Sequence, residues 1–309
     1  MKKNPKLILI DAQAVLHRAW HALPQLTDPQ GRVTNAAYGF TALLLKLINE
    51  QKPDYITVAF DTKAPTFRHK KYKEYKAGRE KQPQIFYDQI DFTKDIIKSF
   101  NIPIFEKDGF EADDLIGAII KAQKKNIPNL ECLIITGDLD LCQLIDKQTS
   151  VYFFRHGFSQ TKIYDEKAVK ERFDFSPQQL IDFKALSGDP SDNIKGVPGV
   201  GPKTALILIK KFKNIERLYQ HLEKCIEKKE NCLIKEPLMQ LLLKNKKHAF
   251  LHKELVTIVQ KIPGLSLKKL KSLKTFDLEK IAHVFQEFGF KSLIKRLEKN
   301  GLGQQNKLF

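Results

Sequence analysis

The feature that most constrains the fold is an alternation of short apolar runs with helical patterns over residues 1–190. The runs have the length and β-branched character of buried strands. They are Leu7–Ile10, Tyr55–Phe60, Leu130–Ile135 and Val151–Phe154. Between them, apolar residues recur at helical spacing in Ala36–Asn49, Asp88–Phe100 and Ala112–Ala122. Strands that alternate with helices predict an α/β domain with a mainly parallel central sheet flanked by helices.

The pattern changes near residue 175. Residues 176–309 are helical in periodicity, rich in Lys and Leu, and contain no clear strand-like run. A glycine-rich segment, GVPGVG at 196–201, interrupts the helical pattern. We therefore expect an α/β domain over residues 1–175 and a helical subdomain over residues 176–309.

Acidic residues stand at the ends of the predicted strands. Asp11 ends LILID, Asp61 ends YITVAFD, and Asp138 and Asp140 follow the third run in LIITGDLD. Because functional groups gather beyond the carboxyl ends of parallel strands, these acids should converge on one patch. The other candidate acids open a helix in GFEADDLIG or lie in ALSGDPSDN: Glu111, Asp113, Asp114, Asp189 and Asp192.

So many carboxylates in one place repel one another unless cations neutralise them. Mg²⁺ and Mn²⁺ prefer oxygen ligands, and two such ions can assist an in-line phosphoryl transfer. Local structure offers an alternative for most of these acids, since Asp and Glu also favour helix N-termini and turns. That alternative is weakest for Asp11 and Asp61, which directly follow predicted buried strands.

The chain has 53 basic and 36 acidic residues and a formal charge of +17. This excess predicts a polyanionic partner, most often nucleic acid, although a basic surface without a specific partner is the alternative. TFRHKKYKEYKAGREK at 66–81 interleaves Lys and Arg with aromatic residues directly after Asp61. Such a stretch can bind phosphates and stack on unpaired bases; the alternative is a solvated loop.

A glycine-rich turn, IKGVPGVGPKTA at 194–205, lies between predicted helices at 177–187 and 205–212. Helix, glycine-rich turn and helix form a motif whose backbone N–H groups can hold a DNA phosphate. The candidate DNA-binding residues here are Gly196, Gly199, Gly201 and Lys203. An ordinary turn between two helices is the alternative.

The four cysteines, Cys132, Cys142, Cys225 and Cys232, form no CxxC pair. We therefore expect neither a disulfide nor a zinc framework, and a cytoplasmic location. The apolar run after the basic N-terminus is too short for a signal peptide, and no stretch approaches a membrane span. We expect a monomer with no membrane association.

The motifs together are recognisable. LILIDAQAVLHRAWHAL, AFDTKAPTFRHKKYKEYKAGR, GFEADDLIG, ITGDLDLCQL and LSGDPSDNIKGVPGVGPKTA occur in this order. The chain resembles the 5′-nuclease domain of bacterial DNA polymerase I, and more broadly the flap endonuclease family, from about residue 5 to about residue 290. This resemblance implies a PIN-like α/β domain with a helix-hairpin-helix DNA-binding motif near 177–212.

The resemblance also implies roles for the candidate residues. Asp11, Asp61, Glu111, Asp113 and Asp114 would serve a first metal ion, and Asp138, Asp140, Asp189 and Asp192 a second. Residues 62–85 would form a helical arch around the single-stranded 5′ end. Lys76 and Arg79 would contact the scissile phosphate, Arg68 and Tyr75 would orient the strand, and Arg18 matches a basic position near the first metal. The hairpin would grip duplex DNA, in this family often with a bound K⁺.

Two positions depart from the family pattern: Ala12 replaces a usual glycine, and His17 a frequent tyrosine. No polymerase domain follows, so the chain is either a stand-alone nuclease or a fragment. Its tail, residues 301–309, ends in Gln305-Asn306-Lys307-Leu308-Phe309, which is similar to peptides that bind the bacterial sliding clamp. A frayed tail is the alternative.

The sequence thus predicts a structure-selective 5′-3′ exonuclease and 5′-flap endonuclease that acts on DNA with flaps, nicks or free 5′ ends. Removal of RNA primers and flaps in replication and repair, by a protein associated with the nucleoid, is the expected role. Two other functions stay open: a non-catalytic DNA-binding protein and an α/β RNA nuclease. The glycine hairpin favours DNA over RNA, because it suits a duplex backbone.

Overall fold

A six-stranded sheet forms the centre of the protein, in the order β3-β2-β1-β4-β5-β6. The computed structural model describes residues 3–156, 160–228, 232–267, 270–273 and 276–299. The strands are β1 (Lys6–Asp11), β2 (Tyr55–Ala59), β3 (Ile104–Phe105), β4 (Glu131–Thr136), β5 (Thr149–His156) and β6 (Gln160–Tyr164). The helices around the sheet are α1 (Ala12–Ala22), α2 (Asn35–Gln51), α3 (Phe67–Lys71), α4 (Gln84–Ser99), α5 (Ala112–Asn126) and α6 (Glu166–Phe173). The later helices are α7 (Gln179–Ser187), α8 (Pro202–Phe212), α9 (Ile215–Lys228), α10 (Glu236–Lys244), α11 (Lys246–Val256), α12 (Leu278–Glu287) and α13 (Lys291–Lys299).

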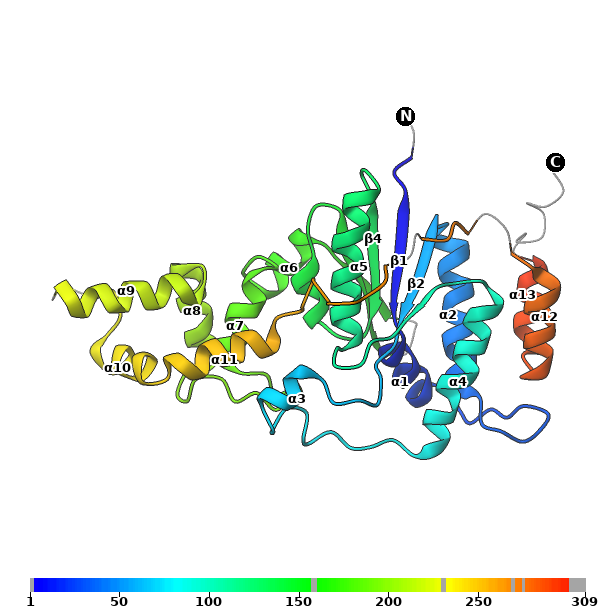
Figure 1. Ribbon diagram of the computed structural model, residues 1–309, viewed down its shortest axis with the longest axis horizontal. Coiled ribbons are helices and arrows are strands. Elements are labelled where there is room, and N and C mark those ends of the chain that lie inside the picture. Colours follow the sequence, from blue (N-terminus) through cyan, green and yellow to red (C-terminus); the bar gives the residue numbers. More distant parts are fainter. Residues whose placement is uncertain (1–2, 157–159, 229–231, 268–269, 274–275, 300–309) are drawn as a thin grey trace.

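The strand order creates a switch point beside β1. β1 pairs in parallel with β2 on one side and with β4 on the other. The earlier strands β2 and β3 therefore extend the sheet on one side of β1, and β4, β5 and β6 extend it on the other. In open parallel sheets, binding sites lie beyond the carboxyl ends of the strands at such a point. Figure 1 shows these ends at the lower edge of the sheet, where α1 begins. The predicted α/β class with a mainly parallel sheet is confirmed.

Alternate residues of the strands supply two separate cores. Ile8 and Ile10 of β1 face the layer of α1, α2 and α4, whereas Leu7 and Leu9 face α5. This period of two places apolar side chains on both faces, which explains why the central strands are continuous apolar runs in the sequence. The helices on both faces fix the position of the strand ends.

The four predicted strands are present with shifts of one or two residues at their ends, and β3 and β6 are additional. β3 is only two residues long. β6 pairs antiparallel with β5 at the edge of the sheet, and four of its five side chains are exposed. An exposed edge strand needs no apolar run, so the sequence pattern did not mark it.

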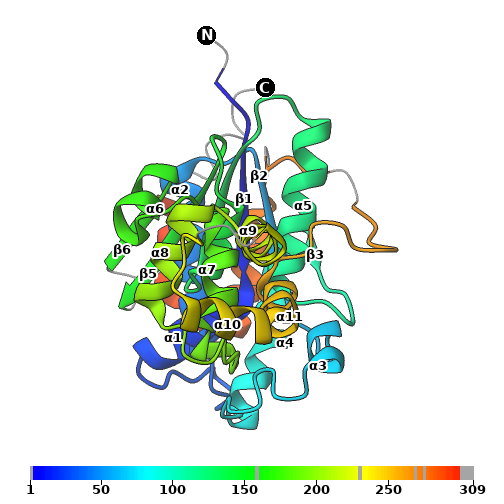
Figure 2. The ribbon, with the colours of Figure 1, turned by 90° about the vertical axis from the view of Figure 1, so that its left-hand side faces the viewer.

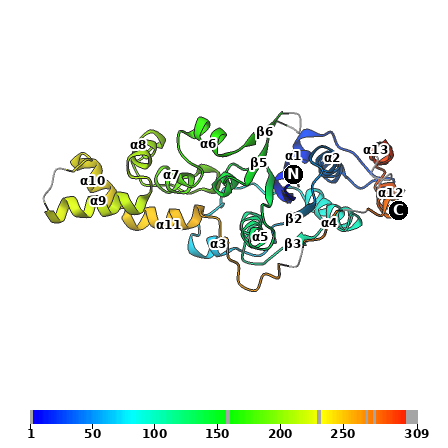
Figure 3. The same cartoon turned by 90° about the horizontal axis from the view of Figure 1, so that it is seen from above.

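The helices α7 to α11 form a lobe at one end of the molecule, with its own apolar core (Figures 1 and 3). Viewed from that end, as in Figure 2, the lobe lies in front of the sheet. α7 packs against both α8 and α11, which closes the lobe.

The expected helical subdomain over residues 176–309 needs a correction. α12 and α13 do not join the lobe but lie at the opposite end of the molecule, against α2 and α4 (Figures 1 and 3). Phe276, Phe285, Phe288 and Leu293 are buried in the same core as β1. An amphipathic helix shows in the sequence that it has an apolar face, but it does not show which surface covers that face. Within the described residues, no helix is long and apolar enough to cross a membrane.

Candidate active site

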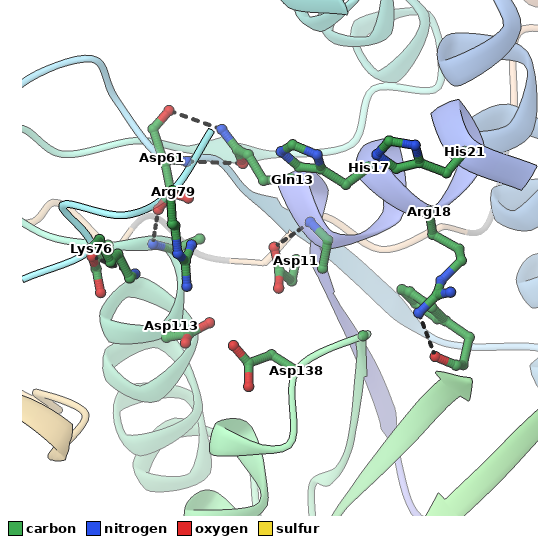
Figure 4. A pocket seen from close by; sticks show the side chains of 15 residues that line it. Asp11, Gln13, His17, Arg18, His21, Asp61, Lys76, Arg79, Asp113 and Asp138 are labelled. Atoms are coloured by element: carbon green, nitrogen blue, oxygen red, sulfur yellow. Dashed lines mark hydrogen bonds and ion pairs between the residues drawn. The ribbon is translucent and has the colours of Figure 1, made fainter. Parts of the chain in front are cut away.

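Four carboxylates meet at the switch point. Asp11 is the last residue of β1, Asp61 follows β2, Asp113 lies in the first turn of α5, and Asp138 follows β4. All four line one cavity of about 430 Å³. Figure 4 shows Asp113 and Asp138 pointing towards each other, with Asp11 and Asp61 beside them. The expected convergence of strand-end acids is therefore present in the structure.

Local hydrogen bonds hold two of these carboxylates in place. Asp11 caps α1 by accepting a hydrogen bond from the backbone N–H of Ala14, and its second oxygen accepts one from Thr136. Asp61 accepts a 2.7 Å hydrogen bond from the backbone N–H of Ala112 at the start of α5. The sequence expectation that Asp11 has little local structural role was wrong, because the strand passes directly into a helix whose N-terminus needs a cap.

The electrostatics of the cavity disfavour four negative charges. Burial raises the pKa of Asp11 to about 7, and the charge of Asp61 adds to the effect. Burial, with repulsion from Asp11 and Asp138, raises the pKa of Asp113 well above its ordinary value. The pKa of Asp61 is also raised, chiefly by burial. A cation in the cavity would remove both causes, since it neutralises the charge and replaces water as a partner of the oxygens.

Basic side chains of residues 66–81 form one wall of the cavity. The Nζ atom of Lys76 lies 2.8 Å from Glu111, and Arg79 donates a 2.6 Å hydrogen bond to Asp192. Both bases line the cavity with the four acids. Glu111 and Asp192 raise the pKa of Lys76 although burial opposes them, so this lysine stays charged. The cavity is thus acidic at its base and cationic along one side.

In the expected helical arch over residues 62–85, only the short helix α3 and the first two residues of α4 are helical. The rest of the segment consists of turns and extended chain, and Figure 1 shows it passing below the strand ends to α4. Closely spaced Lys residues repel one another on a helix, and Gly78 and Pro83 disfavour one. Lys76 itself has a positive φ of 55°, which a regular helix excludes.

A second group of acids lies beside the cavity: Asp140, Asp189 and Asp192. One carboxylate oxygen from each of the three lies within 4.8 Å of the other two. Lys184 of α7 bonds to both Asp140 and Asp189, at 2.8 Å for the latter. Burial opposes this pairing, but Lys184 holds the pKa of Asp189 below its ordinary value. The pKa of Asp140 is still raised to about 7, by burial and by Asp138.

The structure divides the acids differently from the expected first and second sets. Asp138 belongs with Asp11 and Asp113 in the cavity, while its charge also acts on Asp140. Asp114 lies outside the cavity and is fully buried. Glu111 is at the cavity edge, where its backbone N–H bonds to Asp114 and so caps α5.

Arg68 and Tyr75 are buried rather than open to a ligand. Arg68 makes a bidentate ion pair with Asp114, in which its two Nη atoms lie 2.6 and 2.8 Å from the two carboxylate oxygens. It also donates hydrogen bonds to the backbone carbonyls of residues 255 and 257. The hydroxyl oxygen of Tyr75 lies 3.0 Å from a carboxylate oxygen of Glu111 and 2.9 Å from one of Asp192, and its single proton is shared between them. These contacts join the basic stretch to α5 and to the segment after α11, so both side chains position the site. A partner 46 residues away in the chain, as Asp114 is from Arg68, leaves no local sequence signal.

Helix α1 contributes further cavity residues that the acid pattern did not reveal. Gln13 exchanges two hydrogen bonds with the backbone of Asp61, at 3.0 and 3.2 Å. His17 lines the cavity with its ring 4.4 Å from that of Phe86, and burial lowers its pKa, so it is mainly neutral near pH 7. Arg18 reaches the carbonyl of Phe154 at 3.4 Å and also lines the cavity. The helical spacing of residues 13, 17 and 18 after Asp11 is a signal that could have identified this face.

The glycine-rich turn between α7 and α8 needs at least two of its glycines. Gly196 has a φ of 69°, and a Cβ there would lie 2.3 Å from the backbone nitrogen of Gly188. Gly199 also has a positive φ, whereas Gly201 does not and caps α8 without a side-chain bond. Lys203 is exposed in the first turn of α8. The first backbone N–H groups of α8 therefore lie beside a surface cation.

The donor set fits divalent metal ions. The cavity acids offer only carboxylate oxygens, which are the ligands that Mg²⁺ and Mn²⁺ prefer. Burial, with repulsion from neighbouring acids, raises the pKa values of Asp11, Asp61 and Asp113, so a bound cation would stabilise their ionised forms. Within the described residues, the second group of acids offers a further oxygen cluster.

Two family models match adjoining parts of this chain, which together span residues 6–280. One, described as the N-terminal resolvase-like domain of 5′-3′ exonucleases, matches residues 6–174. The other, described as their C-terminal SAM fold, matches residues 175–280. The chain belongs to the 5′-3′ exonuclease family. The resemblance inferred from the sequence motifs is confirmed.

This member of the 5′-3′ exonuclease family is similar in sequence to part of bacterial DNA polymerase I. It is 38% identical to DNA polymerase I of Bacillus subtilis over 298 residues, which are 96% of this chain and 33% of the relative. It is 40% identical to DNA polymerase I of Caldicellulosiruptor bescii over 295 residues, 94% of this chain and 33% of the relative. The chain therefore spans about a third of the length of the curated relatives that it matches.

Solved structures share the fold. The bacteriophage T5 flap endonuclease, in a complex with DNA and metal ions, aligns with a TM-score of 0.67 at 20% identity, over 96% of this chain and 98% of that one. The catalytic core of Rad2 with a DNA substrate aligns with a TM-score of 0.62 at 16% identity, over 96% of this chain and 93% of that one. The sheet and the lobe of this 5′-3′ exonuclease thus follow one shared architecture.

Proposed function

We propose that this chain is a structure-selective nuclease that shortens DNA from 5′ ends and cuts 5′ flaps by two-metal hydrolysis of a phosphodiester. The observation that carries the proposal is the cavity at the switch point, where four buried acids face the two bases Lys76 and Arg79. Family membership and the DNA complexes of the bacteriophage T5 flap endonuclease and Rad2 support the same substrate class.

The acids would hold the metal ions. Asp11, Asp61, Asp113 and Asp138 fit one ion or the shared face of two, and Asp140, Asp189 and Asp192 fit the second. Glu111 stands at the edge and would act directly or through water. When bound, two such ions stabilise the attacking and the leaving oxygens of an in-line displacement. The identity of the ions as Mg²⁺ or Mn²⁺ is part of the proposal.

Lys76 and Arg79 would bind the scissile phosphate. Both pair with acids at the cavity edge, so a phosphate that enters replaces Glu111 and Asp192 as their partner. Their charge then lies where negative charge develops in the transition state, which favours cleavage over binding alone. Arg18 is placed on the opposite side of the cavity, on α1, to steady the same phosphate or its neighbour.

His17 and Gln13 would shape the entry for the 5′ end. The neutral ring of His17 lies against Phe86, at the border with a second cavity lined by both His17 and Asp61. A neutral ring beside an aromatic one offers a flat face for an unpaired base. Gln13 fixes the backbone of Asp61 and so orients its carboxylate.

The glycine-rich turn would hold the duplex. The N–H groups at the start of α8, with Lys203 beside them, suit a backbone phosphate. We propose a K⁺ ion at this turn as part of the same grip. The tail, Gln305–Phe309, lies outside the described residues, and binding of a sliding clamp by it remains a proposal, as do primer removal and a cytoplasmic, monomeric state.

One assay tests the function. A labelled 5′-flap DNA is incubated with the protein and Mg²⁺, Mn²⁺ or EDTA, beside a single-stranded RNA of equal length. We expect metal-dependent cleavage of the flap that EDTA abolishes and that leaves the RNA largely intact. Binding of DNA without cleavage under every metal condition would refute the proposal and favour a non-catalytic DNA-binding protein. Preferential cleavage of the RNA would favour an RNA nuclease.

A further inference from the structure

A second cluster of metal-ligating side chains lies far from the strand ends, in the lobe. His221 and Cys225 belong to α9, and Cys232 lies in the segment that enters α10. Figures 1 and 3 show α9 and α10 at the end of the molecule opposite α12 and α13. We propose that these three side chains form a zinc site that ties the end of α9 to the start of α10.

The spacing of the ligand atoms fits a tetrahedral zinc ion. The Nε2 atom of His221 lies 3.4 Å from the Sγ atom of Cys225 and 3.8 Å from that of Cys232. The three ligand atoms all lie within 4.8 Å of one another. With Zn–S and Zn–N bonds of about 2.3 and 2.0 Å at tetrahedral angles, nitrogen and sulfur are about 3.5 Å apart. The two observed distances lie on either side of that value.

The secondary structure brings the ligands together. His221 and Cys225 are four residues apart, so they share one face of α9. That face packs on the apolar core of the lobe, where Cys225 is buried and the ring of His221 lies 5.1 Å from that of Phe212. His221 uses its Nε2 atom for the contacts with both cysteines and for a 3.4 Å contact from the backbone N–H of Leu233. The same lone pair would bind the metal.

The ligand types select zinc over the ions of the active site. Thiolates are soft ligands and imidazole is borderline, whereas Mg²⁺ and Mn²⁺ prefer carboxylates. Zinc with two thiolates and a neutral imidazole carries no net charge, so the nearby Lys211, which donates to the carbonyl of Leu233, does not oppose it. Three protein ligands leave the fourth position to water.

The proposed site would stabilise the lobe rather than take part in cleavage. Among the described residues before α10, the backbone N–H of Leu233 contacts His221 and its carbonyl accepts a hydrogen bond from Lys211, so a metal bound at His221 would add a further tie between these elements. A metal that binds only the folded lobe raises its stability by mass action. Under the proposed function, the lobe carries the glycine-rich turn that holds the duplex, so loss of this zinc site would weaken duplex binding more than the cleavage step.

The test uses Co²⁺ as a spectroscopic probe in place of zinc. Reduced full-length protein is treated with a chelator, desalted and titrated with Co²⁺, and thiolate-to-cobalt charge-transfer absorption is measured before displacement by Zn²⁺. Asp138→Asn removes an oxygen ligand of the active site, and Cys132→Ala removes a buried cysteine elsewhere; both should keep the absorption. Cys232→Ser, at a half-buried loop position, and His221→Gln should lose it while their circular dichroism stays unchanged.

We expect one equivalent of cobalt with this absorption, and an increase of the unfolding temperature by several degrees on zinc binding in the wild type but not in Cys232→Ser. Absence of the absorption in the reduced wild-type protein would overturn the proposal. So would its persistence in Cys232→Ser and His221→Gln. A Cys225–Cys232 disulfide whose reduced form takes up no metal would overturn it as well.

Discussion

Two groups of carboxylates lie side by side at the carboxyl edge of the sheet, and they differ in how far basic side chains pair with them. Asp11, Asp61, Asp113 and Asp138 line one cavity, and the pKa values of the first three are raised chiefly by burial, with repulsion from neighbouring acids. Asp189 and Asp192 are paired with Lys184 and Arg79. The first group therefore lacks cations that the second already has.

This difference indicates how the two groups would respond to metal. A divalent ion that enters the first group relieves repulsion and displaces no protein cation. An ion that enters the second group must compete with Lys184, which bonds to both Asp140 and Asp189. We therefore expect the first group to bind metal more tightly, with the second filled at higher metal concentration or once DNA draws Arg79 and Lys76 away.

Removal of one ligand from each group should have unequal effects. Asp138→Asn, in the cavity, should slow flap cleavage about 10³-fold at any Mg²⁺ concentration, because several kcal/mol of charge stabilisation are lost. Asp140→Asn should slow it less, about 10-fold, and higher Mg²⁺ should restore part of the rate, because Asp189 and Asp192 remain to bind the ion with lower affinity. Single-turnover cleavage across a Mg²⁺ series measures both. Equal losses in the two variants would contradict the comparison.

Replacement of Lys76 should lower the rate of flap cleavage more than the affinity for duplex DNA. Lys76→Ala should slow cleavage about 10²-fold, because Lys76 is placed to meet charge that develops in the transition state. Duplex affinity should change by less than about threefold, since one phosphate contact among several is lost. Lys73→Ala, at an exposed position of the same stretch, is the matched control and should leave both values unchanged. A defect of Lys76→Ala in binding alone would argue against the assigned role.

Removal of the Lys184 ammonium should leave the second group, like the first, without a paired cation at Asp140 and Asp189. Lys184→Met leaves Asp140 and Asp189 without their partner, so the free energy of unfolding of the metal-free protein should fall by about 2 kcal/mol. Mg²⁺ should then restore more stability to this variant than to the wild type. Chemical denaturation with and without Mg²⁺ measures the difference. Lys124→Met breaks an ion pair with Asp146 away from the site, and Mg²⁺ should not rescue it.

The stability of the metal-free protein should fall as pH rises. The pKa values of Asp11 and Asp140 are raised from 3.8 to about 7, so these groups bind protons more tightly in the folded chain than in the unfolded one. Their contribution is full below about pH 4 and is lost as pH rises through 7, a change of at least about 1 kcal/mol. Asp11→Asn or saturating Mg²⁺ should flatten the profile measured by thermal unfolding. A profile that rises over this range in the absence of metal would exclude the raised values.

The sequence predicted those parts of the site that depend on local pattern. A strand that ends in an acid is visible in a few residues, and parallel strands bring their carboxyl ends together, so Asp11, Asp61 and Asp138 could be expected to meet. Contacts between side chains that are far apart in the chain could not be predicted in this way. Lys184 lies 44 residues from Asp140, and Arg68 lies 46 from Asp114. Periodicity likewise predicted helices beyond residue 176, but not that the apolar face of α12 covers α4.

The same limit applies to the cysteines. The expectation of no zinc framework rested on the absence of CxxC, a local pattern. The cluster of His221, Cys225 and Cys232 depends instead on one helical turn and on a loop that returns to it. A search for His and Cys four residues apart on one helix face would have found two of the three.

The lobe of α7 to α11 leaves the sheet after α6 and returns to it. Beyond α11 the chain runs back to β2, where Leu273 donates a 3.1 Å hydrogen bond to Asp54 and Ser272 pairs with Tyr55. The lobe is thus anchored at both ends to one body, as an insertion is. Under the proposed function, the glycine-rich turn and the acidic cavity are then two DNA-contacting sites at a constant distance from each other. The position of the cut relative to the duplex would be set by that span and not by the base sequence.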